Sequence, residues 1–159
     1  MEQERLYQRA LEVMEENFSH MVEMSLASCA NNVVAVRDVH AYYHQGKMYV
    51  LSKTTNTFMH QIAVCANVGL CHGSHNMQGV AKSLGHPCEP QNATLRKNLK
   101  KQFSLNYSDY VAESNPDMRI VEITLTKAET YTRYHRYEID FVAKTADRDH
   151  TEPLFVYRV

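Results

Sequence analysis

One polar segment of this sequence, residues 52–57, has the residue types of an anion-binding loop. It consists of Ser52, Lys53, Thr54, Thr55, Asn56 and Thr57. An apolar pattern at helical spacing follows it, so the segment stands at the predicted start of a helix. A helix N-terminus presents backbone N–H groups and the positive end of a dipole, and Lys53 and the threonines would add charge and hydroxyl donors for a phosphate. The alternative is a well-capped helix start that binds no ligand.

Arg37 is the second candidate, because it is a charged residue inside an apolar stretch that is predicted to be a strand. On that strand it shares a face with Val33, Ala35, Val39 and Ala41. A buried charge is costly without a partner, and the planar guanidinium group matches a phosphate well. Two kinds of partner remain open: a ligand phosphate, or an internal carboxylate such as that of Asp38 or Glu23.

Other clusters of reactive side chains are arranged less favourably for chemistry. Possible metal ligands between residues 71 and 88 are Cys71, His72, His75, His86 and Cys88. We expect no metal site, because consecutive strand residues such as Cys71 and His72 point to opposite faces and no standard zinc spacing is present. The sequence also contains no nucleophile elbow, Walker loop or glycine-rich dinucleotide turn, so no catalytic residue is assigned. In an enzyme of this kind, a cofactor would carry the difficult chemistry.

The composition argues against several classes of protein. The net charge is −1, whereas a protein that coats nucleic acid needs a basic surface. No apolar run approaches the roughly 20 residues of a membrane span, and the first 17 residues contain five glutamates where an export signal would be basic. We therefore expect a cytoplasmic protein with reduced cysteines and with no nucleic-acid or membrane partner.

The remaining patterns predict the elements that must position the candidate residues. Apolar residues at helical spacing predict helices at 6–18, 58–67 and 95–103, with a short helical turn at 107–111. Alternating or β-branched stretches predict strands at 22–30, 33–43, 48–52, 68–72, 77–84, 120–125, 131–142 and 153–159. About seven strands with mostly hairpin connections favour a closed antiparallel β-barrel with peripheral helices. No repeat or linker interrupts the chain, so we expect a single domain, 1–159.

Several motifs occur together in an order and spacing that resemble the pyridoxamine 5'-phosphate oxidase superfamily. These motifs are the glycine-lysine strand at 46–52, His60-Gln61-Ile62, the run at 66–71 and the later Gly79-Val80-Ala81. Arg37 lies where members of that superfamily often have an arginine in the preceding strand. The resemblance covers residues 21–84 well and the remainder by element order.

The resemblance implies a fold, an assembly and a cofactor. The fold would be a split antiparallel β-barrel, mainly β with peripheral helices, and the assembly a homodimer with FMN between the subunits. The implied cofactor-binding residues are Arg37, Ser52, Lys53, Thr54, Thr55, Asn56, Thr57, His60 and Gln61. Gln61 would hydrogen-bond the flavin ring or ribityl chain, or else be an exposed helix residue. His60 would face the ligand, or else be an ordinary surface group.

Two departures from the superfamily pattern change where the phosphate would be held. Phe58 stands where members often have a lysine that contacts the flavin phosphate, and Val68 replaces the usual proline after Asn67. We therefore expect Lys53 or Arg37 to hold the phosphate. The implied activity is that of an FMN-dependent oxidoreductase acting on a small molecule. The alternative is a non-catalytic protein, for example a stress-response protein, that binds a flavin or a haem-type ligand.

Overall fold

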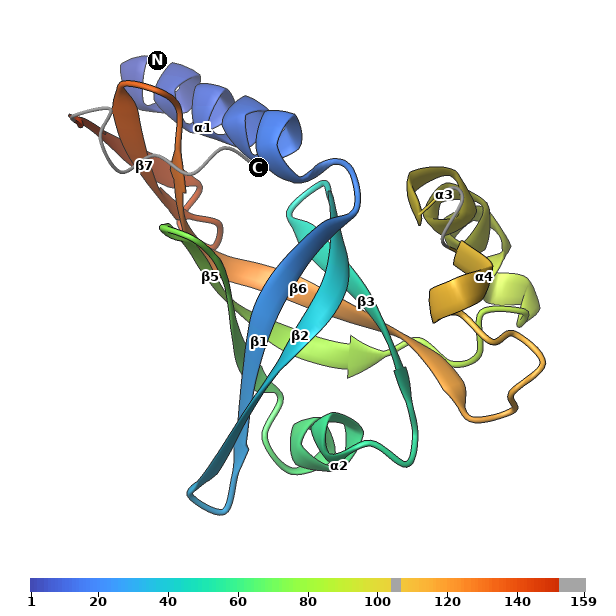
Figure 1. The fold of residues 1–159 in the computed structure, drawn as a ribbon. Coiled ribbons are helices and arrows are strands. Elements are labelled where there is room, and N and C mark those ends of the chain that lie inside the picture. The colour runs from blue at the N-terminus through green and yellow to red at the C-terminus, as the bar shows by residue number, and fades with distance from the viewer. Residues whose placement is uncertain (104–106, 152–159) are drawn as a thin grey trace.

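The fold is described from a computed structural model, which describes residues 1–103 and 107–151 (Figure 1). The elements follow the chain as α1 (Glu2–Phe18), β1 (Val22–Ala30), β2 (Val33–His44), β3 (Lys47–Lys53), α2 (Thr57–Val64), β4 (Asn67–His72), β5 (His75–Ser83), the short 3-10 helix η1 (Pro90–Asn92), α3 (Ala93–Phe103), α4 (Tyr107–Tyr110), β6 (Met118–Tyr131), β7 (His135–Asp140) and β8 (Thr145–His150). Within this part of the chain, no helix is long and apolar enough to cross a membrane.

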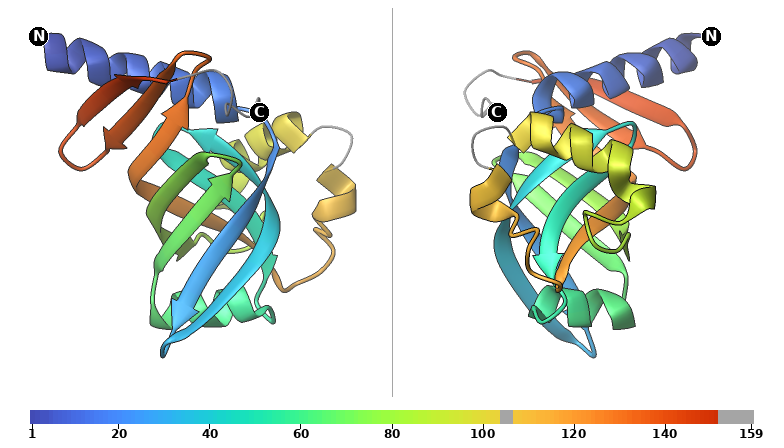
Figure 2. Two further views of the ribbon diagram at one scale, coloured as in Figure 1. Left: turned by 60° about the vertical axis from the view of Figure 1, so that its left-hand side comes forward. Right: turned by 90° about the vertical axis from the view of Figure 1, so that its right-hand side faces the viewer.

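Six of the strands close into an antiparallel barrel. The strand order is β3-β2-β1-β4-β5-β6, and β3 also pairs with β6, which closes the ring. The strands β7 and β8 continue the same sheet beyond β6, outside the closed ring (Figures 1 and 2). The mainly β architecture and the closed antiparallel barrel that the sequence predicts are therefore confirmed.

The hairpins of the barrel turn at residues that accept a left-handed backbone. The turn between β1 and β2 has φ of 51° at Asn31 and 63° at Asn32, and the turn between β2 and β3 has φ of 48° at Gln45 and 79° at Gly46. Positive φ at both central residues gives a turn whose twist matches that of the strands it joins. Asparagine tolerates this conformation and glycine adopts it without strain, which explains the turns that the sequence predicts here.

Gly79 is required for a different reason, the close approach of two strands. A Cβ atom at this position would lie 2.7 Å from Ile123 Cγ2 and 2.7 Å from the carbonyl oxygen of Thr124. The register between β5 and β6 shifts at Gln78 and Gly79, so β6 passes unusually near the β5 backbone at this point. A side chain here would push the two strands of the barrel apart.

The core fills the barrel, and two helices cover its ends. The apolar stripe of α1 buries Ala10, Val13, Met14 and Phe18, and Figure 1 shows this helix at one end of the barrel and α2 at the other. From α2, Phe58 and Ile62 join the same core. A smaller cluster packs α3 and α4 against the outside of the barrel through Leu99, Phe103, Tyr107 and Ile120.

The strand prediction fails in the final third of the chain. The stretch 131–142 is two elements rather than one, because the chain turns after Tyr131. The Thr132 N–H donates to the His135 carbonyl at 2.9 Å, and the His135 N–H donates to the Thr132 hydroxyl at 3.2 Å. Strand β8 was missed because only Ala146 among its residues is buried, so its sequence carries little apolar alternation. The predicted strand at 153–159 lies outside the described residues.

Candidate functional site

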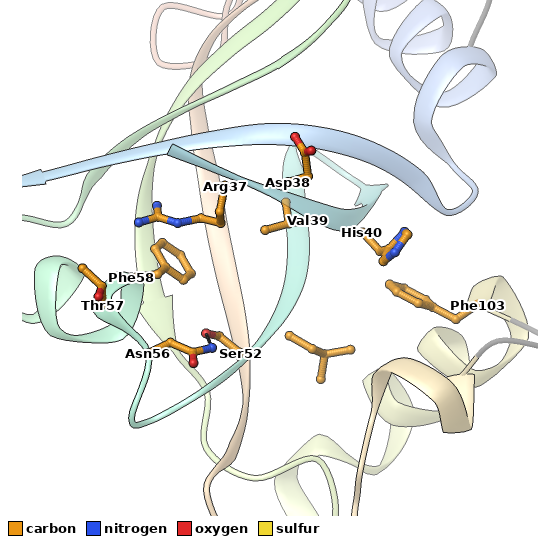
Figure 3. Close-up of a pocket in the computed structure, with 10 residues that line it drawn as sticks. Arg37, Asp38, Val39, His40, Ser52, Asn56, Thr57, Phe58 and Phe103 are labelled. Carbon is orange, nitrogen blue, oxygen red and sulfur yellow. Dashed lines mark hydrogen bonds between the residues drawn. The ribbon is translucent and has the colours of Figure 1, made fainter. Parts of the chain in front are cut away.

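A pocket of about 410 Å³ lies between β2, β3, the first turn of α2 and the end of α3. Figure 3 shows the side chains that line it. They are Arg37, Asp38, Val39, His40, Leu51, Ser52, Asn56, Thr57, Phe58 and Phe103. The pocket therefore combines the two strongest candidates from the sequence, Arg37 and part of the polar segment 52–57.

The N-terminus of α2 borders this pocket and keeps free backbone donors. The side chain of Asn56, the N-cap residue, makes no capping hydrogen bond, because its amide donates instead to Ser52 Oγ at 3.0 Å. Among residues 1–103 and 107–151, no acceptor binds the backbone N–H of Thr57 or of Phe58. Unsatisfied N–H groups at a helix N-terminus, together with the helix dipole, favour an anion at this end of the pocket.

Arg37 lies at the same end of the pocket and has no carboxylate partner in the described part of the chain. Its Nη1 donates to Ser28 Oγ at 2.7 Å and to the Leu26 carbonyl at 3.3 Å. Its guanidinium carbon lies 5.2 Å from the ring centre of Phe58. Asp38, one of the possible partners, instead accepts a hydrogen bond from Ser25 at 2.9 Å.

The environment of Arg37 therefore disfavours its charge. Burial lowers the pKa of the Arg37 guanidinium, because the surrounding protein removes water without supplying a counter-charge. In the described residues no acceptor binds Nε or Nη2, the edge of the guanidinium that suits a two-point contact with an anion. A ligand phosphate would supply the missing negative charge.

The other end of the pocket is apolar and aromatic. Phe103 and His40 stand across the pocket from Ser52, Asn56 and Thr57 in Figure 3. Leu51 and Val39 complete this wall, whereas the ring of Phe58 lies beside Arg37 at the cationic end. A pocket with a cationic, N–H-rich end and an aromatic end suits an amphipathic ligand that carries an anionic group at one end and a flat ring at the other.

Similar proteins were found by comparing structures, and none by comparing sequences. The sequence matches no family model and no curated protein. General stress protein 26 from Bacillus anthracis matches with a TM-score of 0.61 at 12% identity, over 76% of this chain and 92% of that one. A FAD-binding protein from Mesorhizobium loti matches with 0.59 at 16% identity, over 75% and 91%. A protein from Clostridium acetobutylicum, described as related to general stress protein 26 and as of the pyridoxinephosphate oxidase family, matches with 0.57 at 11% identity, over 89% and 98%.

The chain has the split-barrel fold of these proteins. The resemblance that the motifs at 46–84 suggest is thereby confirmed at the level of fold. The six-stranded ring is the barrel, and the pocket lies on its β2–β3 side, where the chain leaves β3 and enters α2.

The split barrel brings together four of the nine residues that the sequence proposes for cofactor binding. Arg37, Ser52, Asn56 and Thr57 line the pocket. The lining does not include Lys53, Thr54, Thr55, His60 or Gln61. Lys53, the last residue of β3, and Thr55, in the turn before α2, are both exposed, and His60 is exposed on the helix itself. The backbone of this turn is fixed by Asn56 N–H, which donates to the Lys53 carbonyl at 2.9 Å, and by Thr54 N–H, which donates to the Asp117 carbonyl at 2.9 Å.

Gln61 is neither exposed nor part of the pocket wall. It is buried, its Nε2 donates to the Val33 carbonyl at 2.9 Å, and its Oε1 accepts a hydrogen bond from Ser28. The expectation of an exposed helix residue is therefore wrong. The direct contact between Gln61 and a flavin stays a prediction.

Sequence reasoning missed Ser28 and the apolar wall of the pocket. Ser28 follows Val22, Met24 and Leu26 on the buried face of β1, so a polar residue on an otherwise apolar face was the available signal. Phe103 and Leu51 had no such signal, because apolar residues at these spacings are typical of core packing.

Proposed function

We propose that this split barrel binds FMN, with the phosphate between Arg37 and the N-terminus of α2. The observation that carries this proposal is the Arg37 guanidinium, which is partly buried, has no carboxylate partner in the described residues, and leaves its Nε–Nη2 edge without an acceptor. The hydroxyls of Ser52 and Thr57 lie in the same pocket. Contacts of this charge-assisted kind contribute roughly 1.5–3 kcal/mol each.

The flavin ring would occupy the aromatic end of the pocket. The ring of Phe103 and the side chain of Leu51 line that end, and they would exclude water from one side of the flavin ring. The description of the Mesorhizobium loti neighbour as a FAD-binding protein is in keeping with a flavin in this fold. Lys53, Thr54 and Thr55 remain candidates for contact with the outer side of the phosphate, because they precede the free end of α2 in sequence.

The proposed activity is that of an oxidoreductase acting on a small molecule. A bound flavin would supply the hydride or electron chemistry, and the chain would bind it, orient it and exclude water. The purified protein should be yellow, should bind FMN more tightly than riboflavin, and should pass electrons from a reduced nicotinamide to a small acceptor. A yellow protein without turnover supports the non-catalytic alternative. A protein that takes up haem and not FMN overturns the proposal.

We also propose that the chain forms a homodimer in the cytoplasm. Support comes from exposed valines on the barrel, since Val34 and Val36 on β2 are 66% and 65% exposed and Val80 on β5 is 42% exposed. Exposed apolar residues mark interaction surfaces where they gather on one face, as Val34 and Val36 do on β2. Light scattering at micromolar concentration should give about twice the 18.4 kDa mass of the chain. A monomer across that range would remove this part of the proposal.

A further inference from the structure

A chain of hydrogen bonds links the backbone of β2, helix α2, strand β1 and the candidate anion-binding arginine. Gln61 Nε2 donates to the Val33 carbonyl at 2.9 Å, Ser28 Oγ donates to Gln61 Oε1, and Arg37 Nη1 donates to Ser28 Oγ at 2.7 Å. Ser28 and Gln61 are only 2% and 6% exposed. Neither of them lines the pocket, so their link to a ligand there runs through Arg37.

The direction of every proton in this chain follows from its first member. A backbone carbonyl only accepts, so the Gln61 group that faces Val33 must be its NH₂ group. The Gln61 oxygen then faces Ser28, and the Ser28 hydroxyl must donate to it. The Ser28 oxygen is left with lone pairs alone on its other side, and these accept from the Arg37 cation.

The same arrangement selects which edge of Arg37 is held and which stays open. Both contacts to β1, the Ser28 hydroxyl and the Leu26 carbonyl, are made by Nη1. The Phe58 ring, one helical turn before Gln61 on α2, lies 5.2 Å from the guanidinium carbon. Because Nη1 is fixed in this way, Nε and Nη2 are free to make a two-point contact with an anion, and the side chain loses less freedom when the anion binds.

We propose that Ser28 and Gln61 are positioning residues that hold Arg37 ready to bind the phosphate of the cofactor. This inference rests on the proposed FMN site. It assigns Gln61 a role behind the arginine, in place of a direct contact with the flavin. It also gives a function to Ser28, which sequence reasoning missed.

The test is a double-mutant cycle with two ligands that differ only in the phosphate. Kd values for FMN and riboflavin are measured for the wild type, Ser28→Ala, Arg37→Leu and the double variant, with melting temperatures of each. Ser28→Ala should lower the preference for FMN over riboflavin by about 3- to 10-fold and should have almost no further effect in the Arg37→Leu background. Independent, additive losses in the double variant would overturn the inference.

Ser25→Ala is the matched control, because Ser25 is on the same strand and also bonds a β2 residue, Asp38, at 2.9 Å, whereas the hydrogen bonds of Arg37 go to Ser28 and Leu26. Ser25→Ala should leave the preference for FMN unchanged. If Ser28→Ala proves too unstable to titrate, Gln61→Met removes the orientation of Ser28 from the other side and must give the same shift. An unchanged preference in Arg37→Leu refutes the FMN site itself. A changed preference in Arg37→Leu with none in Ser28→Ala or Gln61→Met refutes the positioning role alone.

Discussion

Two arginines of this protein, Arg37 and Arg96, differ in whether the Nε–Nη2 edge of the guanidinium group has an acceptor. Arg96 on α3 directs its Nε and Nη2 atoms at the carboxylate of Glu113, at 2.6 and 2.7 Å. Arg37 offers the same pair of atoms and has no acceptor for them in the described residues. Hydrogen bonding to Glu113 raises the pKa of Arg96, whereas burial lowers the pKa of Arg37.

The difference separates a structural ion pair from a binding group. The Arg96–Glu113 pair is complete, because the Tyr107 hydroxyl also donates to Glu113 at 2.6 Å and the Lys100 ammonium lies 3.8 Å from the same carboxylate. This cluster joins α3 and α4 and needs no ligand. Arg37 is fixed through Nη1, which bonds Ser28, and its Nε–Nη2 edge stays open beside the free N–H groups at the N-terminus of α2. An arginine maintained in this state is expensive unless an anion completes it.

The largest expected effect is that of Arg37→Leu on cofactor affinity. Loss of the charge-assisted contacts should weaken FMN binding about 10- to 100-fold. Riboflavin has no phosphate, so its affinity should change little. Fluorescence titration of both ligands measures the two constants. Equal losses for FMN and riboflavin would mean that Arg37 does not contact the phosphate.

Arg96→Leu should have the opposite profile, a loss of stability with binding intact. The substitution leaves Glu113 without its main partner, and the melting temperature should fall by roughly 2–6 °C. FMN affinity should stay within about a factor of two, since Arg96 does not line the pocket. Thermal melts and titration of the same preparation test both parts. A strong loss of FMN binding here would remove the distinction between the two arginines.

The completed ion pair should also give a specific pH dependence. Hydrogen bonds from Arg96 lower the pKa of Glu113 from its ordinary 4.5 to about 2. A carboxyl whose pKa is lower in the folded state stabilises the fold above its unfolded pKa, and this contribution disappears as the pH falls through about 2. The difference in melting temperature between wild type and Glu113→Gln should therefore be full at pH 6 and shrink steadily below pH 4.5. A difference that stays constant over this range contradicts the ion-pair assignment.

The smallest expected effect is that of Lys53→Met. Lys53 is exposed and does not line the pocket, so it acts on the phosphate through solvent. FMN affinity should fall only about 2- to 3-fold, and the effect should fade at high salt because exposed charges are screened. A titration at low and high ionic strength measures this. A loss as large as that of Arg37→Leu would transfer the main phosphate contact to Lys53.

Much of the barrel could be predicted because its signals are local. The alternation in β1 and β6, the apolar stripe of α1 and the asparagine turn at residues 31–32 each specify one element within a few residues. Strand β8 lacked such a signal, since its exposed charged residues resemble a loop. The break after Tyr131 depends on a turn closed by Thr132 and His135, neither of which is a typical turn residue.

The site could be predicted only in part, because its assembly depends on strand register. Arg37 and the segment 52–57 were identified from residue type, since a cation in an apolar strand and a polar helix start can be recognised in the sequence itself. That Ser28 lies behind Arg37 follows from the pairing of Leu26 with Arg37 across β1 and β2. The position of Phe103 follows from the packing of α3 on the barrel. Neither relation is encoded in the spacing of neighbouring residues.

The most direct test of the central claim is thermal unfolding of the wild type and Arg37→Leu, each with and without FMN. A ligand at a hundredfold excess over its Kd stabilises the folded state by roughly 2.7 kcal/mol. At the FMN concentration that gives this stabilisation in the wild type, a 10- to 100-fold weaker affinity should reduce it to roughly 0.4–1.4 kcal/mol in Arg37→Leu. The melting temperatures of the two proteins without FMN should be almost the same. If Arg37→Leu instead melts well below the wild type without FMN, and its stabilisation by FMN survives, then Arg37 is a structural residue and the phosphate site lies elsewhere.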